Sequence, residues 1–139
     1  MEKRVTGLGG IFFKMNDPKK TTAWYDAHLG LNFKGSTYQT FKWREREKPE
    51  QIGGTTFSLF PKDTTYFSPS DSSFMINLRV ENLEKLLEIL RGEGVTIVGE
   101  MEAYDYGKFA WIMDPEGNKI ELWEPIDEVL EDWDKENNV

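Results

Sequence analysis

Alternating apolar and polar positions near the C-terminal end of the chain predict two strands joined by a tight turn. The segment runs from Trp111 to Pro125 and reads WIMDPEGNKIELWEP. Its centre, Asp114 to Asn118, combines proline with glycine and asparagine, which favour turn positions. Because strand side chains alternate between faces, Glu121 and Trp123 would share one face. The pattern therefore places one carboxylate on a sheet face, as a ligand, a base, an ion-pair partner or a solvated group.

A strand followed by a capped helix occurs twice, 65 residues apart. The first strand begins at Gly10 and its helix follows Asp17; the second begins at Met75 and its helix follows Asn82. Asp and Asn are good N-cap residues, and glycines follow both helices as C-terminal caps. A period of this length indicates duplication of one structural unit.

Further strands are predicted after each helix. The expected strand ranges are 32–43 and 54–60 in the first half, and 95–102, 107–113 and 119–124 in the second. We therefore predict an α+β chain, 1–139, made of two βαβββ modules, approximately 8–67 and 74–125, joined by a polar linker at 68–73. The expected core between the sheet and the helices is Ile11, Phe13, Met15, Ile76, Leu78, Val80, Leu86, Leu87, Leu90, Ile120 and Leu122.

Composition and charge exclude several classes of function. The formal net charge of −8 disfavours nucleic acid as a partner, and the chain contains no cysteine for a disulfide or thiolate site. No apolar run approaches membrane-spanning length, so we expect no membrane partner and a cytoplasmic location. Residues 126–139 form an acidic tail that we expect to be a short solvated helix or a frayed end rather than a site.

The duplicated unit, the helix ending WYDAHLGL and the closing DPEGNKIEL resemble the vicinal oxygen chelate superfamily, which includes glyoxalase I, bleomycin resistance proteins and extradiol dioxygenases. The resemblance implies a curled mixed sheet whose concave face holds a ligand, and a homodimer. It places metal ligands at Gly10, Met75, Glu121 and approximately Thr56. Only Glu121 is a good ligand for a hard or borderline metal. We therefore predict no cofactor and no metal site, and divalent metal is disfavoured.

The single histidine does not change this expectation. His28 falls in the last turn of the first predicted helix, where it would interact favourably with the helix dipole. A nonhaem iron site needs two histidines, and a catalytic zinc site normally needs three protein ligands.

Strand alternation predicts which side chains face the concave side. The candidate ligand-binding residues are Phe12, Lys14, Met75, Asn77, Arg79, Phe109, Trp111 and Trp123. Lys14 and Arg79 are one repeat apart and would orient an anionic ligand near Glu121. Alternatively, Glu121 pairs with one cation, both cations lie on the wet rim, or the aromatic rings fill the space as core. The nearby loop residues Glu102, Tyr104, Asp105 and Tyr106 are expected to be solvated.

Two functions remain open at this stage. The first is a binding protein for a small anionic or aromatic molecule, with the metal site lost. The alternative is a glyoxalase-like lyase or isomerase in which Glu121 is the catalytic base or a metal ligand. Nothing in the sequence separates them, and the fold itself hosts both kinds of protein.

Overall fold

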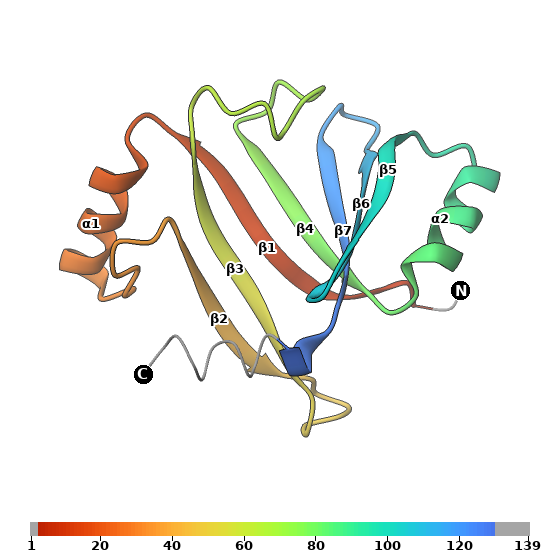
Figure 1. Cartoon of the computed structure of the whole chain (residues 1–139), viewed down its shortest axis with the longest axis horizontal. Coiled ribbons are helices and arrows are strands. Elements are labelled where there is room, and N and C mark those ends of the chain that lie inside the picture. Colours follow the sequence, from red (N-terminus) through yellow and green to blue (C-terminus); the bar gives the residue numbers. More distant parts are fainter. Residues whose placement is uncertain (1–2, 130–139) are drawn as a thin grey trace.

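The structure is a computed structural model that describes residues 3–129. The described part folds as one seven-stranded mixed sheet with a helix on each flank (Figure 1). In chain order the elements are β1 (Val5–Met15), α1 (Pro18–Leu29), β2 (Tyr38–Arg44), β3 (Ile52–Pro61), β4 (Phe74–Val80), α2 (Leu83–Gly92), β5 (Ile97–Tyr104), β6 (Gly107–Met113) and β7 (Lys119–Pro125). No helix among the described residues is long and apolar enough to cross a membrane. The α+β class and the duplicated mixed sheet are confirmed.

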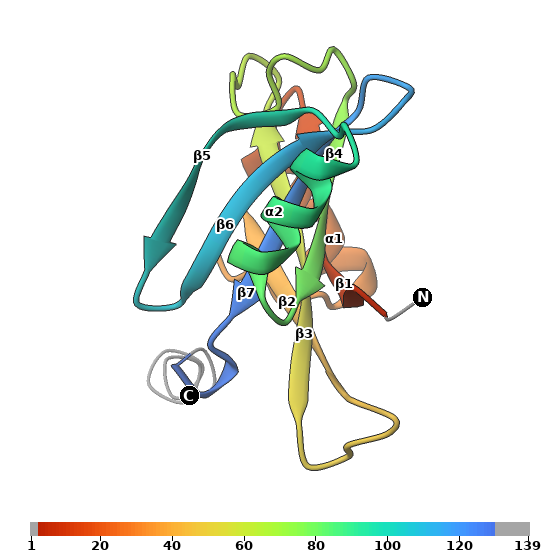
Figure 2. The same ribbon diagram turned by 90° about the vertical axis from the view of Figure 1, so that its right-hand side faces the viewer.

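The two halves meet where β1 pairs antiparallel with β4. The sheet order is β2-β3-β1-β4-β7-β6-β5, with β1 parallel to β3 and β4 parallel to β7. Ile11 lies opposite Ile76 at the centre of the β1–β4 pair, so two residues that are equivalent in the 65-residue repeat face each other. The β5–β6 hairpin curves away from the central strands (Figure 2).

The first half differs from its predicted βαβββ order. Two strands follow α1, not three, so the first half is βαββ. Residues 30–37 form turns instead of extended chain, with left-handed φ angles of 61° at Gly30, 67° at Asn32 and 53° at Lys34. The Asp26 carboxylate holds this segment by accepting hydrogen bonds from the backbone N–H groups of Phe33 (2.6 Å) and Lys34 (3.1 Å). Left-handed residues interrupt the extended backbone that a strand needs.

The predicted caps and turn are confirmed. The side chain of Asp17 accepts a hydrogen bond from the Lys20 N–H at 3.0 Å, and Asn82 does the same for Lys85 at 3.3 Å. Asp114 closes the β6–β7 turn, since its Oδ1 accepts the N–H groups of residues 116 and 118, both at 2.9 Å. Gly117 adopts a φ of 80° there. Local side-chain chemistry thus positions β7, the strand that carries Glu121.

The helix-facing core is centred on α2 and the second half of the sheet. Its buried members are Val80, Leu83, Leu86, Leu87, Ala110 and Leu122, with Leu78, Leu90 and Ile120 packed against them. The predicted core members Ile11, Phe13, Met15 and Ile76 are only partly buried. The reason is geometric: α1 packs on β3 and α2 packs on β6 and β7, so neither helix covers the middle of the outer face (Figure 1).

Truncating Leu87 tests this core. Leu87 is 3% exposed in the α2 cluster, whereas Leu29 at the end of α1 is 61% exposed. We expect Leu87→Ala to lower the free energy of unfolding by about 2–5 kcal/mol. The matched control, Leu29→Ala, should change it by less than about 0.5 kcal/mol. Chemical denaturation of both variants measures the difference, and equal losses would contradict the core assignment.

Candidate functional site

The concave face of the sheet carries a cavity of about 670 Å³. A cavity of this size is typical of small-molecule sites. Its walls come from both halves of the sheet, from the loop after β3, from the β5–β6 turn and from the segment after β7. The lining residues are Phe12, Tyr38, Thr40, Lys42, Ile52, Gly53, Gly54, Thr56, Ser58, Phe60, Tyr66, Arg79, Tyr106, Glu121, Trp123, Asp127 and Val129.

Glu121 lies in this wall with both carboxylate oxygens engaged. Its side chain is almost fully buried, with 3% of the residue exposed. Asn77 Nδ2 donates to Oε1 at 2.7 Å, while Trp111 Nε1 donates to Oε2 at 3.0 Å. The Tyr66 hydroxyl donates to Oε2 as well. Three donors from β4, β6 and the loop after β3 therefore fix the orientation of the carboxylate.

Burial and hydrogen bonding act on Glu121 in opposite directions. Burial raises the pKa of the Glu121 carboxyl, and its three donors and the nearby Lys119 charge counter part of that increase. Burial also acts on Lys119 and lowers the pKa of its ammonium group, while the nearby charge of Glu121 opposes that decrease. The Lys119 ammonium donates to the Tyr66 carbonyl oxygen at 2.8 Å and lies over the Tyr66 and Trp111 rings, 5.4 and 5.6 Å from their centroids. Burial, and then the charge of Glu121, raises the pKa of the Tyr66 hydroxyl, which therefore stays a donor.

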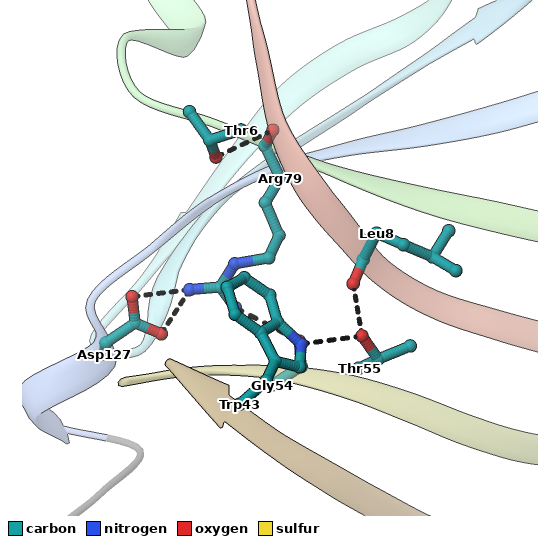
Figure 3. Close-up of polar contacts among 7 residues, drawn as sticks. All are labelled: Thr6, Leu8, Trp43, Gly54, Thr55, Arg79 and Asp127. Carbon is teal, nitrogen blue, oxygen red and sulfur yellow. Dashed lines mark hydrogen bonds and ion pairs between the residues drawn. The ribbon is translucent and has the colours of Figure 1, made fainter. Parts of the chain in front are cut away.

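Arg79 supplies the second buried charge of the cavity wall. It projects from β4 between the indole rings of Trp43 and Trp123, and its guanidinium pairs with Asp127 (Figure 3 draws this cluster without Trp123). Gly53 permits the close approach of Trp43, because a Cβ there would lie 2.5 Å from the indole. Of the charged side chains that line the cavity, Glu121 and Arg79 are the buried ones, and they lie two residues apart in register on neighbouring strands.

Four of the predicted site residues line the cavity, namely Phe12, Arg79, Glu121 and Trp123. Four others lie behind its surface. Asn77 and Trp111 hold Glu121, Met75 packs in a buried cluster with Phe12, Phe67 and Trp111, and Phe109 stacks on Trp123 with 5.7 Å between ring centroids. The expected pairing of Trp111 with Glu121 across β6 and β7 is confirmed.

The structure does not bring Lys14 to the cavity. Because β1 and β4 are antiparallel, the two halves of the repeat place Lys14 and Arg79 toward opposite ends of the central pair. The Lys14 ammonium lies over the Phe67 ring, 5.4 Å from its centroid, and only Arg79 of the two lines the cavity. The structure therefore does not bring the two cations together around one cavity.

The repeat also changes register on the last strand of each half. Phe12 pairs with Ser58, whereas Asn77, 65 residues after Phe12, pairs with Glu121. The counterpart of Glu121 is therefore Ser58, and the expected position, Thr56, lies two residues away on the same face. At Gly10, a Cβ would lie 2.6 Å from the Phe12 ring, so the glycine makes room for an aromatic wall.

Sequence reasoning missed several residues of the site. Lys119 has the same strand parity as Glu121 and could have been assigned by alternation. Tyr66 lies in a polar loop, where no period predicts its direction. Tyr106 is 43% exposed, in line with its expected solvation, and also lines the cavity. Asp127 pairs with Arg79, although the acidic tail was expected to lie outside any site. The rest of that tail, residues 130–139, lies outside the described residues.

The side chains around Glu121 do not resemble the ligand set of a metal centre. Within residues 3–129, no group of three or more His, Asp or Glu side chains is arranged to hold a metal ion. The groups that contact the Glu121 carboxylate are N–H and O–H donors. A divalent metal prefers several lone-pair donors, so these side chains do not fit one as they stand.

A curved mixed sheet of two related halves around a concave cavity defines a glyoxalase-like fold. Residues 8–122 match the model of the Glyoxalase/Bleomycin resistance protein/Dioxygenase superfamily, and the chain belongs to that superfamily. The resemblance recognised from the sequence is thereby confirmed. A comparison with curated proteins found no match.

Solved structures share the fold at low sequence identity. Methylmalonyl-CoA epimerase from Mycobacterium tuberculosis is 20% identical, with 94% of this chain and 95% of that chain covered and a TM-score of 0.57. Hypothetical protein BH1468 from Bacillus halodurans C-125 is 14% identical over 85% and 93% of the two chains, with a TM-score of 0.54. The 2,3-dioxygenase LapB from Pseudomonas sp. KL28 is 12% identical over 86% and 42%, with a TM-score of 0.52.

Replacing Glu121 by Gln tests the electrostatics of the site. The pKa of Glu121 is raised above its ordinary value of 4.5, so its ionisation opposes folding. The stability that the protonated Glu121 carboxyl contributes is fully present below about pH 4.5, and it is lost as the pH rises through the folded-state pKa. We therefore expect the stability of Glu121→Gln relative to the unmodified protein to increase from about pH 4.5 upward. Denaturation at several pH values measures this difference. Glu88→Gln, at an exposed position, controls for losing one charge, and no trend specific to Glu121 would contradict the assignment.

Proposed function

We propose that this protein binds a small molecule with an aromatic body and a carboxylate or similar anionic group on its concave face. The observation that carries the proposal is the cavity of about 670 Å³, which combines aromatic walls with two buried charged side chains. Phe12, Phe60 and Trp123 offer apolar surface, which supplies most of the energy of burying an aromatic ring. Arg79 offers the cation that an anionic group would need.

The polar group of the ligand has a second potential partner in Glu121. A buried carboxylate accepts hydrogen bonds from a donor on the ligand, and in its protonated form it also donates one. Its three protein donors hold it in place, so little side-chain freedom is lost on binding. We propose that binding needs no metal, because the groups facing Glu121 are donors.

An enzymatic role for Glu121 is the second candidate. Its raised pKa and its place in the cavity wall suit a general base that removes a proton next to a carbonyl group. Arg79 would hold the carboxylate of such a substrate two residues away in register. An epimerase among the proteins of similar fold is compatible with this chemistry, as a fold-level analogy only.

Filling the cavity tests the binding proposal. The probe is 2-naphthoate, an aromatic carboxylate, with affinity measured by calorimetry. Ser58 lines the cavity, and Ser58→Trp should weaken binding by about tenfold or more, or at least 1.4 kcal/mol, by occupying the space of the ring. Ser73→Trp is the matched control at an exposed position outside the lining. Adding a chelator should leave the affinity unchanged. Unaltered binding to Ser58→Trp would place the probe elsewhere and contradict the proposal.

Proton exchange separates the binding protein from the enzyme. With 2-oxobutanoate in deuterated water, a base at Glu121 would accelerate exchange at the carbon next to the carbonyl, as followed by NMR. Glu121→Gln should abolish that acceleration, while 2-naphthoate, the probe of the binding test, still binds. Equal exchange with and without the protein would favour the binding function alone.

A homodimer and a cytoplasmic location remain predictions from the resemblance and the sequence. The partly exposed apolar residues on the outer face, among them Ile11 and Ile76, offer a surface that a second copy would cover.

A further inference from the structure

Arg79 is buried far more deeply than its counter-ion. The Arg79 side chain is 5% exposed, whereas that of Asp127 is 40% exposed. The guanidinium carbon lies 5.3 Å from the ring centroid of Trp43 and 5.1 Å from that of Trp123. The guanidinium therefore lies against two indoles, while its partner Asp127 lies at the solvent side.

The pairing uses only part of the guanidinium. Both carboxylate oxygens of Asp127 contact one nitrogen, Nη2 (Figure 3). The other terminal nitrogen, Nη1, donates to the Gly54 carbonyl oxygen at 3.4 Å, a long distance for such a bond. A carboxylate that contacts two guanidinium nitrogens at once makes the stronger, forked arrangement. Asp127 contacts only Nη2 and therefore does not make the forked arrangement.

Asp127 also lies at the boundary between two cavities. It lies two residues beyond the end of β7, outside the sheet ladder. Asp127 and Arg79 line both the concave cavity and a smaller, more polar cavity of about 330 Å³. Their ion pair therefore stands in the wall between the two spaces, where movement of the Asp127 side chain would uncover the guanidinium.

We propose that Arg79 is the anion-recognising group of the concave pocket and that Asp127 is an internal competitor for it. A ligand carboxylate takes the place of the Asp127 carboxylate on the guanidinium, and Asp127 turns into solvent. The indoles keep Arg79 in position during the exchange. This inference rests on the proposed function and adds that the chain carries its own competitor for the anion site. Competition of this kind reduces the apparent affinity by the fraction of time for which Arg79 is uncovered.

Neutralising Asp127 tests the competition. We expect Asp127→Asn to raise the affinity for 2-naphthoate by roughly five- to tenfold, because the site no longer holds its own anion. The affinity for 2-naphthamide, which has the same ring and no charge, should stay the same. Glu128→Gln removes one charge at the neighbouring exposed position and controls for the general field. Asp127→Ala is the second variant and should change affinity in the same direction, and circular dichroism verifies that each variant is folded.

The outcomes separate this inference from the proposed function. If 2-naphthoate binds the unmodified protein and Asp127→Asn equally, and Ser58→Trp still weakens it, the competition is overturned while the pocket stands. A lower affinity in both Asp127 variants also overturns it, since Asp127 would then be positioning Arg79. An equal gain for 2-naphthamide would show that Asp127 only blocks access, and would overturn the charge competition. If neither probe binds any variant, the proposed function and this inference fail together.

Discussion

The antiparallel pairing of β1 with β4 is the constraint on which the rest of the structure depends. Ile11 faces Ile76 across this pair, and each of the two strands carries the last strand of its own half on its other edge. The inner faces of both halves thereby become one continuous concave surface. Phe12 from the first half and Glu121 from the second meet in the same cavity only because of this pairing.

The two buried charges of that surface are accommodated by different physical means. Glu121 is surrounded by N–H and O–H donors, which stabilise a carboxylate without a formal cation in contact. Arg79 lies between two indoles and against one carboxylate, so its charge is offset by aromatic faces and an ion pair. Burying an isolated charge is costly, and such fixed charges in a cavity are therefore candidates for ligand recognition. The pair gives the pocket both polarities two residues apart in register on neighbouring strands.

Much of the fold was predictable because its signals are local. The caps at Asp17 and Asn82 and the turn at Asp114 act over three or four residues, and the period of two assigned Glu121 and Trp123 to one face. Predictions failed where a long-range arrangement decided the outcome. The outer face of the central strands is only partly buried because the helices pack on the flanks, a fact that no periodicity in Ile11 or Ile76 contains.

The sequence by itself determined the superfamily, the duplicated strand–helix unit and the face on which Glu121 lies, since each follows from short-range spacing or from a repeat. The tertiary structure alone decided which residues surround that carboxylate and which cation accompanies it. Antiparallel pairing moved Lys14 away from Arg79, a two-residue register change replaced Thr56 by Ser58, and irregular segments brought in Tyr66 and Asp127. The direction of a loop side chain depends on contacts distant in the chain, and the residues of the loop do not encode it in their spacing.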